Sequence, residues 1–396
     1  MLLGCLGVGT APAQDTTPGD LAGAISGGDP GLAFRYRYEF VDDDSFGRDA
    51  HASTLRLRLN YETGRWENWS GFVEFDYVGE VLIKDFNSGA GTSGPNRSRY
   101  PVVADPAGPD LNQLYLQYAP AEDWRFRFGR QRILLDDQRF VGGVGWRQNE
   151  QTYDGLSFTY GGFDRTTVFY SYVANVARIF GTEVDAGSQE QDTHLLNVDV
   201  ELTRDWHAIG YVYRIDNDDA PAFSTSTFGL RVEGSVSLPS GALDLVADYA
   251  RQSDAGNSPA NFDTDYRRLR LVWRRDALSL GAGVEVLGSD NGEGFRTPLA
   301  TLHAFNGWAD RFLATPSAGL VDVYLQGGFE AADWQFRLRY HDFEADAGSS
   351  DFGQEFDLSA SRQFADRYQL LLKLAAFDGD TLDDVIKAWV MISAAF

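Results

Sequence analysis

The side chains with the clearest chemical potential in this sequence are arginines that alternate with apolar residues. Residues 34–40 read FRYRYEF and residues 54–61 read TLRLRLNY, and the same arrangement returns in DWRFRFG, RRLRLVW and DWQFRLRY. A guanidinium group carries a planar fork of N–H donors that matches a carboxylate at two points. The pattern therefore indicates a carboxylate-binding surface. The arginines placed in this way are Arg35, Arg37, Arg56, Arg58, Arg125, Arg127, Arg268, Arg270, Arg337 and Arg339.

A period of two is typical of β-strands, whose successive side chains point to opposite faces. In a soluble sheet the aromatic face would be the core, whereas in a membrane barrel it would contact lipid and the arginines would face a water-filled lumen. The chain contains about eighteen such segments of roughly 9 to 12 residues, the length of a tilted strand that crosses a bilayer.

The connections between these segments alternate in length. Short turns are expected at 62–68, 120–123, 161–164, 203–205, 238–241, 275–277, 330–332 and 363–366, and long segments at 81–110, 134–151, 175–192, 253–263 and 288–318. Short periplasmic turns and long extracellular loops are typical of outer-membrane barrels. The sequence thus predicts an all-β fold, a transmembrane antiparallel β-barrel of about 18 strands. Tryptophans near the strand ends fit an interfacial girdle, namely Trp66, Trp69, Trp124, Trp206, Trp273 and Trp334.

The two ends of the chain suggest export to the outer membrane. Residues 1–13 form a short apolar run that ends in Ala-Pro-Ala, which indicates a signal peptide whose missing basic start fits a truncated reading frame. Residues 14–30 are expected to be a flexible lead-in, and residues 31–396 the barrel. The final strand ends in Phe396, the type of signal read by the outer-membrane assembly machinery, and closure requires that strand to pair with the first.

Composition excludes several classes of function. The formal net charge is -24, from 34 Lys and Arg against 58 Asp and Glu, which argues against nucleic acid as a partner. The five histidines have no evident catalytic constellation, and we expect His303 to brace an inward-folded loop. No cofactor, metal site or enzymatic activity is expected. The expected partners are outer-membrane lipid, lipopolysaccharide and an anionic solute.

Arginines on neighbouring strands repel one another unless acids or bound anions offset their charge. We therefore expect an acidic wall that opposes the arginines, and its candidates are Glu74, Asp76, Asp199, Glu201, Asp244, Asp248, Glu355 and Asp357. Two roles for the arginines follow. They either attract anionic solutes into the lumen, or they pair with nearby acids and hold the wall rigid.

Two longer segments carry a more specific signal. FGRQRILLDDQRFVGGVGWRQNEQTYDGLSF at 128–158 and TPLATLHAFNGWADRFLATPSAGLVDVY at 297–324 resemble bacterial outer-membrane proteins of the alginate-export family. Asp136 replaces a glycine of the family motif, Gln151 an arginine and Tyr153 a phenylalanine. The resemblance implies an arginine-rich lumen and adds Arg130 and Arg139 to the pore-lining candidates. The motif positions that fit are Gly129, Arg130, Gln131, Asp137, Arg139, Trp146, Asp154 and Gly155.

Alginate exporters also have a long periplasmic loop that plugs the lumen, and no periplasmic turn expected here is long enough to do so. We therefore expect an outer-membrane channel that passes anionic solutes, such as uronate-type oligosaccharides or polysaccharide and organic acids. The alternatives are a general diffusion porin with a transverse charge field and, from other classes, an outer-membrane enzyme or an adhesin.

Overall fold

The computed structural model describes residues 20–94 and 96–396. The predicted signal peptide at 1–13 and the start of the predicted lead-in fall outside these ranges. The rest of the lead-in differs from the prediction, because it contains helix α1 (Leu21–Ser26) and the first strand begins at Asp29. Asp20 caps this helix, since its carboxylate accepts a hydrogen bond from the backbone N–H of Gly23 at 2.7 Å. Among the described residues, no helix has the length and apolar character needed to cross a membrane.

One antiparallel sheet of eighteen strands contains nearly all of the regular structure of the described residues. Its strands are β1 (Asp29–Asp43), β2 (Ala50–Glu62), β3 (Trp69–Asp85), β4 (Gly108–Tyr118), β5 (Trp124–Gln131), β6 (Thr152–Phe163), β7 (Thr166–Ala177), β8 (Ser188–Thr203), β9 (Trp206–Ile215), β10 (Thr225–Leu238), β11 (Gly241–Asp254), β12 (Asp263–Arg275), β13 (Leu278–Leu287), β16 (Leu320–Ala331), β17 (Trp334–Glu344), β18 (Asp351–Phe364), β19 (Tyr368–Gly379) and β20 (Val385–Ala395). The connecting segments add β14 (Ser289–Asp290), β15 (Glu293–Gly294) and the 3₁₀ turns η1 (Asp185–Gly187), η2 (Pro221–Phe223) and η3 (Leu302–Ala304).

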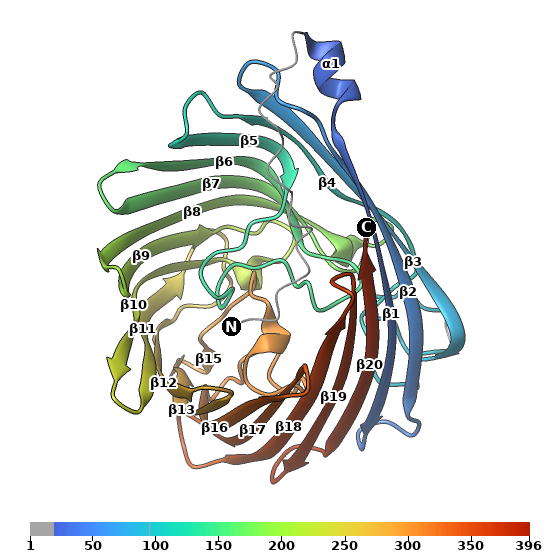
Figure 1. The fold of residues 1–396 in the computed structure, drawn as a ribbon. Helices are drawn as coiled ribbons and strands as arrows, with labels where there is room; N and C mark the ends of the chain where they lie inside the picture. Colours follow the sequence, from blue (N-terminus) through green and yellow to red (C-terminus); the bar gives the residue numbers. More distant parts are fainter. Residues whose placement is uncertain (1–19, 95) are drawn as a thin grey trace.

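The sheet closes on itself, as the sequence predicted. Strand β1 pairs with β2 on one side and with β20 on the other, in a register that joins Ala33 to Ala395 and Asp43 to Val385. Figure 1 shows the blue first strand beside the red last strand. Closure pairs the backbone groups that an open edge would leave exposed, which a lipid environment requires. The chain therefore forms a closed eighteen-stranded antiparallel β-barrel.

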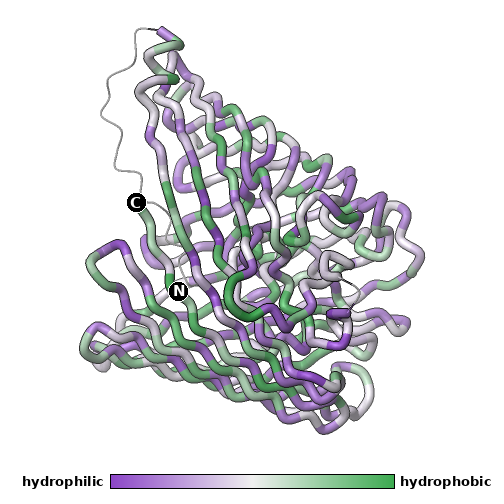
Figure 2. The backbone as a smooth tube through the Cα atoms, turned by 90° about the vertical axis from the view of Figure 1, so that its right-hand side faces the viewer, coloured by the Kyte–Doolittle hydropathy of each residue, from purple (hydrophilic) through white to green (hydrophobic). Residues whose placement is uncertain are grey.

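Hydrophilic and hydrophobic residues alternate along the strands (Figure 2), as expected when successive side chains face the lipid and the lumen in turn. On β2, Leu59 is 51% exposed while its neighbour Arg58 is 8% exposed. On β17, Leu338 is exposed and lies between Arg337 and Arg339, which are partly buried. In a free-standing barrel the lipid face counts as exposed surface, so the exposed leucines mark that face. The arginines of these strands consequently point into the lumen.

The predicted connections are confirmed at both ends of the barrel. Each of the eight short turns overlaps its predicted range, and the longest of them lies at 63–68 between β2 and β3. Trp69, Trp124, Trp206 and Trp334 each begin a strand at this short-turn end, as a girdle requires. Trp124 packs against Tyr160 with ring centroids 4.4 Å apart.

The long segments 86–107, 132–151 and 288–319 do not extend away from the barrel but fold into it (Figure 1). A parallel bridge joins Val141 of the second segment to Leu299 of the third. Phe140 packs on Tyr211 and Tyr266 of the wall, with each pair of ring centroids 5.2 Å apart. The hydrophobic core of this protein therefore sits inside the barrel, between the inward-folded loops and the wall.

Candidate functional site

The arginines of β1 hold the inward-folded segment 132–151 against the wall. Arg35 donates hydrogen bonds to the side-chain oxygen of Gln148 at 2.9 Å and to the carbonyl of Gly145 at 2.8 Å. Arg37 is fully buried and lies 3.0 Å from Glu39 and 2.9 Å from Asp105, a residue of the segment 86–107. These two side chains therefore join two loops to the barrel and do not line open water.

The arginines of β2 serve the same segment. Arg58 contacts Asp76 of β3 at 2.6 Å and Glu150 of the loop at 2.9 Å, and Glu74 lies 3.7 Å away. Arg56 donates a hydrogen bond to the carbonyl of Gln148 at 3.3 Å. Charges buried in this way are stable only when each is paired and hydrogen-bonded. The arginines of this group are thus paired with nearby acids, the contact that their second expected role requires.

Three further predicted arginines are also paired. Arg130 makes a two-point contact with Asp154, at 2.7 and 2.8 Å. Arg139, at the inner end of the loop, lies 2.6 Å from Glu285. Arg268 lies 2.6 Å from Asp137 of the same loop, and so links it to β12. The paired arginines thus come from both sides of the barrel.

The other five predicted arginines differ. Within residues 20–94 and 96–396, no ion pair is formed by Arg125, Arg127, Arg270, Arg337 or Arg339. Arg125 is exposed and the rest are partly buried. They belong to β5, β12 and β17, on the face opposite exposed lipid-facing residues such as Phe128, Leu271 and Leu338. They remain as charged groups directed into the lumen.

The predicted acidic wall opposite the arginines is wrong, because the acids are interleaved with the arginines. Asp76 lies directly across from Arg58, Asp248 across from Arg268, and Asp357 across from Arg339. Glu74 is likewise held by Arg132 at 3.1 Å. Cross-strand neighbours of opposite charge stabilise an antiparallel sheet locally. The register of strand pairing decides which acid lies across from which arginine. The arginine repeats alone do not define that register.

The remaining acids of that prediction have other partners. Asp199 contacts His207, Glu201 contacts Arg165, and Asp244 contacts Arg274, all near the short-turn end. One carboxylate oxygen of Glu355 accepts the backbone N–H groups of Trp308 and Ala309 at 2.5 and 2.7 Å. Glu355 is therefore an anchor for the segment 288–319.

A second anchor of that segment is a buried chain of polar groups. Lys373 of β19 approaches the Nε2 atom of His303 at 2.5 Å, and the Nδ1 atom of His303 contacts Asp310 at 2.6 Å. Trp146 stacks on His303 with centroids 4.3 Å apart. Burial lowers the pKa of His303 to about 3, so the ring stays neutral at physiological pH. The predicted bracing role of His303 is confirmed.

Asp136 and Asp137 are adjacent acids of the segment 132–151, and their pKa values are shifted in opposite directions. Arg268 and Arg231 contact Asp137 at 2.6 and 2.7 Å, and although burial opposes ionisation, their charges hold the pKa of Asp137 well below its usual range. Asp136 reaches the lumen, and restricted hydration raises its pKa to about 6. Arg231 was missed by the sequence prediction because β10 has one lumen-facing arginine, beside Glu233, and lacks the Arg-x-Arg repeat.

The positions that depart from the family motif have local structural reasons. Asp136 has φ of 52°, in the left-handed region that glycine adopts freely and that aspartate tolerates. Gln151 is buried and donates hydrogen bonds to the carbonyls of Gly142 and Leu299 at 3.1 Å each. Tyr153 adds a hydroxyl that donates to Gly142 at 2.7 Å. In this chain both residues tie the two inward-folded segments together.

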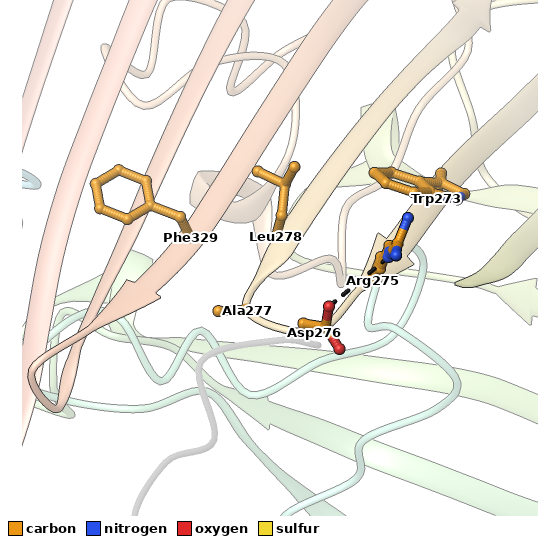
Figure 3. Close-up of a pocket in the computed structure, with 6 residues that line it drawn as sticks. All are labelled: Trp273, Arg275, Asp276, Ala277, Leu278 and Phe329. Atoms are coloured by element: carbon orange, nitrogen blue, oxygen red, sulfur yellow. Dashed lines mark ion pairs between the residues drawn. The ribbon is translucent and has the colours of Figure 1, made fainter. Parts of the chain in front are cut away.

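A shallow groove on the surface lies outside the lumen. It follows the short turn between β12 and β13 and the neighbouring strand β16 (Figure 3). Trp273, Leu278 and Phe329 line it, and its volume is about 340 Å³. Its position on the lipid face separates it from the lumen arginines.

Comparison with known proteins agrees with this architecture. The family model described as alginate export matches residues 29–235, more than half of the chain, and this range includes the first of the two motif segments. No curated protein sequence matches the chain. Among solved structures, Pseudomonas aeruginosa OccK9 (OpdG) is similar with a TM-score of 0.75 and 14% identity, covering 94% of this chain and 99% of that one.

Two further outer-membrane porins show the same fold. Acinetobacter baumannii OccAB2 has a TM-score of 0.74 and 14% identity, covering 94% of this chain and 98% of that one. Pseudomonas aeruginosa OccK8 (OprE) has a TM-score of 0.74 and 15% identity, covering 94% and 99%. At this level of identity the likeness concerns the barrel alone. With its closed barrel and the family match, the chain belongs to the alginate export family and forms an outer-membrane channel.

Proposed function

We propose that this channel passes small anionic solutes, in particular those that carry carboxylates, such as uronates, their short oligomers and organic acids. The observation that carries the proposal is the division of the predicted arginines into two groups. Seven are used up in contacts that hold loops and wall together, and five have no ion pair among the described residues. Those five are the charges that remain for a passing solute.

The surroundings of the five support an attraction for anions. Across the strands, Arg125 faces Thr159, and Arg127 faces Gln117 and Ser157. Arg270 faces Val246 and Gly283. Uncharged neighbours leave the field of a guanidinium uncompensated at short range, where bulk salt screens it least. The high negative net charge of the chain acts from farther away and is screened within roughly 8 to 10 Å.

The same pattern extends to β17, with one exception. Arg337 faces Gly328 and Ser359, whereas Arg339 faces Gln326 and the acid Asp357. In a low-dielectric lumen wall, guanidinium groups favour carboxylates because they offer charge and paired donors at once. The wall near Arg270 and Arg337 thus supports a route for anions.

The inward-folded loops favour small solutes over a long polymer. Phe140 packs against the wall and Trp146 against His303, so the loops lie inside the barrel where an extended chain would have to pass. No turn at the short-turn end of the described barrel resembles a long periplasmic plug, since the longest is 63–68. These features support facilitated diffusion rather than dedicated polymer export.

The alternative transport function is that of a general diffusion porin, in which a transverse electric field crosses the lumen. Such a field needs acids and arginines on separate walls, and the interleaving of Arg58 with Asp76 argues against it. Membership in a family of export channels argues against the enzyme and the adhesin.

The test compares two solutes of one size, galacturonate and galactose, in proteoliposomes. The proposal predicts faster entry of galacturonate, and predicts that replacing all five arginines by Gln removes the difference. The matched control is Arg251→Gln, which removes an exposed arginine paired with Asp263 outside the lumen. Equal entry of both solutes through the wild-type channel would refute the proposal.

A further inference from the structure

Of the five lumen arginines without ion pairs among the described residues, Arg127 has the closest pair of supporting contacts, one on an edge of its guanidinium and one on its face. Its Nε atom donates a hydrogen bond to the side-chain oxygen of Gln117 at 2.9 Å. Its guanidinium carbon lies over the ring of Tyr115, 4.8 Å from the centroid. The first contact fixes one edge of the group and the second fixes its plane.

The ring that supports Arg127 is itself held in place. Tyr115 stacks on Phe72, directly across the strands in register, with centroids 5.3 Å apart and an interplanar angle of 22°. On its other side Tyr115 faces Gly129, which has φ of 120°. A Cβ at Gly129 would lie 2.3 Å from the carbonyl oxygen of Leu114, so a larger residue does not fit there. The space beside Tyr115 therefore stays free of a facing side chain.

The donors left on Arg127 point to one class of ligand. A guanidinium has five N–H groups, and only the one on Nε is used within the described residues. The Nη1 and Nη2 groups form the remaining edge, whose parallel N–H bonds match the two oxygens of a carboxylate. A fork that is already fixed loses little conformational freedom when it binds.

The other four arginines are held less closely. Arg339 makes one long contact, to the carbonyl of Ala304 at 3.5 Å, and lies 5.7 Å from the ring centroid of Trp308. Arg125 is exposed at the second position of β5. Long side chains without such contacts attract anions by charge but must be ordered by each ligand.

We infer that Arg127, oriented by Tyr115 and Gln117, is a carboxylate-binding subsite near the short-turn, periplasmic end of the lumen. Strands β4 and β5 are joined by the short turn 119–123, which places the subsite at that end. The inference rests on the proposed passage of anions. It adds where in the lumen a carboxylate binds and which side chains orient the arginine that binds it. Arg127 binds the solute, and Tyr115 and Gln117 are positioning residues.

The experiment measures block of chloride current through single channels in a planar bilayer, with trigalacturonate added on the periplasmic side and maltotriose as the uncharged control. Arg127→Lys keeps the charge and loses the planar fork. Tyr115→Leu keeps the arginine and removes its platform. Gln117→Leu, as a second positioning variant, leaves the ring in place. Arg251→Lys is the matched control, because Arg251 lies outside the lumen and is paired with Asp263.

The inference predicts that Arg127→Lys raises the half-blocking concentration of trigalacturonate roughly tenfold, the loss of about one charge-assisted hydrogen bond. Tyr115→Leu or Gln117→Leu should raise it by a smaller factor, and Arg251→Lys should leave it nearly unchanged. Heat-modifiable migration of each variant confirms that its barrel is folded.

Three results would overturn the inference. The first is equal block of the wild type and Arg127→Lys, and the second is an effect of Arg251→Lys as large as that of Arg127→Lys. The third is a wild-type channel that trigalacturonate does not block from the periplasmic side. Chloride preference in the unblocked wild type is read separately from its reversal potential. The proposed function therefore survives the first two results, whereas a wild-type channel without that preference would count against it.

Discussion

The two carboxylate oxygens of Asp76 accept hydrogen bonds from Nε and Nη2 of Arg58, at 2.7 and 2.6 Å. Both side chains are at least nine-tenths buried, and Arg58 also reaches Glu150 of the inward-folded segment 132–151. This pair connects the wall to the loop that narrows the lumen. Its arginine is therefore structural, although its sequence context is the same as that of the lumen arginines without ion pairs.

Arg58→Gln should destabilise the barrel by about 3–5 kcal/mol, because it leaves buried carboxylates without their shared cation. The double variant Arg58→Gln with Asp76→Asn should recover part of that loss, since it replaces the ion pair by neutral groups of similar shape. The measurement is the temperature at which the folded form converts to the slower band on gel electrophoresis.

The control for this pair is Arg165→Gln, which removes an exposed ion pair with Glu201 and should cost at most about 1 kcal/mol. A conversion temperature for Arg58→Gln equal to that of Arg165→Gln would show that Arg58 does not anchor the loop.

Asp310→Asn should loosen the segment 288–319 and increase the single-channel conductance. The carboxylate of Asp310 accepts from His303 at 2.6 Å, Lys387 at 2.8 Å and Arg147 at 3.3 Å. Replacing it leaves these buried donors with a weaker, uncharged acceptor.

Conductance and open-channel current noise would be recorded for Asp310→Asn and for Asp276→Asn, a change in an exposed short turn. If the two variants conduct alike, the segment 288–319 does not depend on this contact.

The pKa of Asp136, about 6, predicts a pH-dependent selectivity. This carboxyl is ionised at pH 7 and mostly protonated at pH 5, so acidification removes a negative charge from the lumen. His303, with a pKa of about 3, stays neutral across this range and contributes no charge. Anion preference should therefore rise as the pH falls from 7 to 5.

Reversal potentials at both pH values provide the measurement. Asp136→Asn should show the stronger anion preference at pH 7 already, and little further change at pH 5. A pH dependence of equal size in Asp136→Asn and the wild type would assign the effect to another group.

The barrel could be predicted from the sequence because its signals are local. Alternation in FRYRYEF and TLRLRLNY defines two faces for each strand, and short turns such as 204–205 follow from strand spacing alone. The roles of the arginines could not be predicted in this way. Arg35 and its partner Gln148 are 113 residues apart, so their contact depends on how a distant loop folds inside the barrel.

The register of strand pairing explains why the acids are interleaved with the arginines and do not form the separate wall that the sequence predicted. Whether Asp248 lies across from Arg268 or on the opposite wall depends on strand pairing, which a period-two pattern leaves open. Arg231 was missed for a related reason, since a single lumen arginine between Leu230 and Val232 has no repeat to mark it.

Phe396 is proposed to direct assembly of the barrel, so Phe396→Asp should reduce the amount of folded protein in the outer membrane. Its backbone exchanges hydrogen bonds with Leu32 at 2.8 and 3.1 Å, and its ring packs on Phe34 and Tyr368. Phe364→Asp, at the end of β18, is the control for an added charge at the same end of the barrel. Folded protein would be quantified by heat-modifiable migration, and equal amounts in the two variants would refute a special role for Phe396.

The central claim is that the lumen arginines without ion pairs, and not the paired ones, set the selectivity of the channel. The most direct measurement is the reversal potential in a tenfold potassium chloride gradient across a planar bilayer. The wild type and the neutral-pair variant Arg58→Gln with Asp76→Asn should both prefer chloride. Replacing Arg270, Arg337 and Arg339 by Gln should abolish most of that preference. A cation-selective wild type, or a chloride preference that survives the triple replacement, would contradict the account.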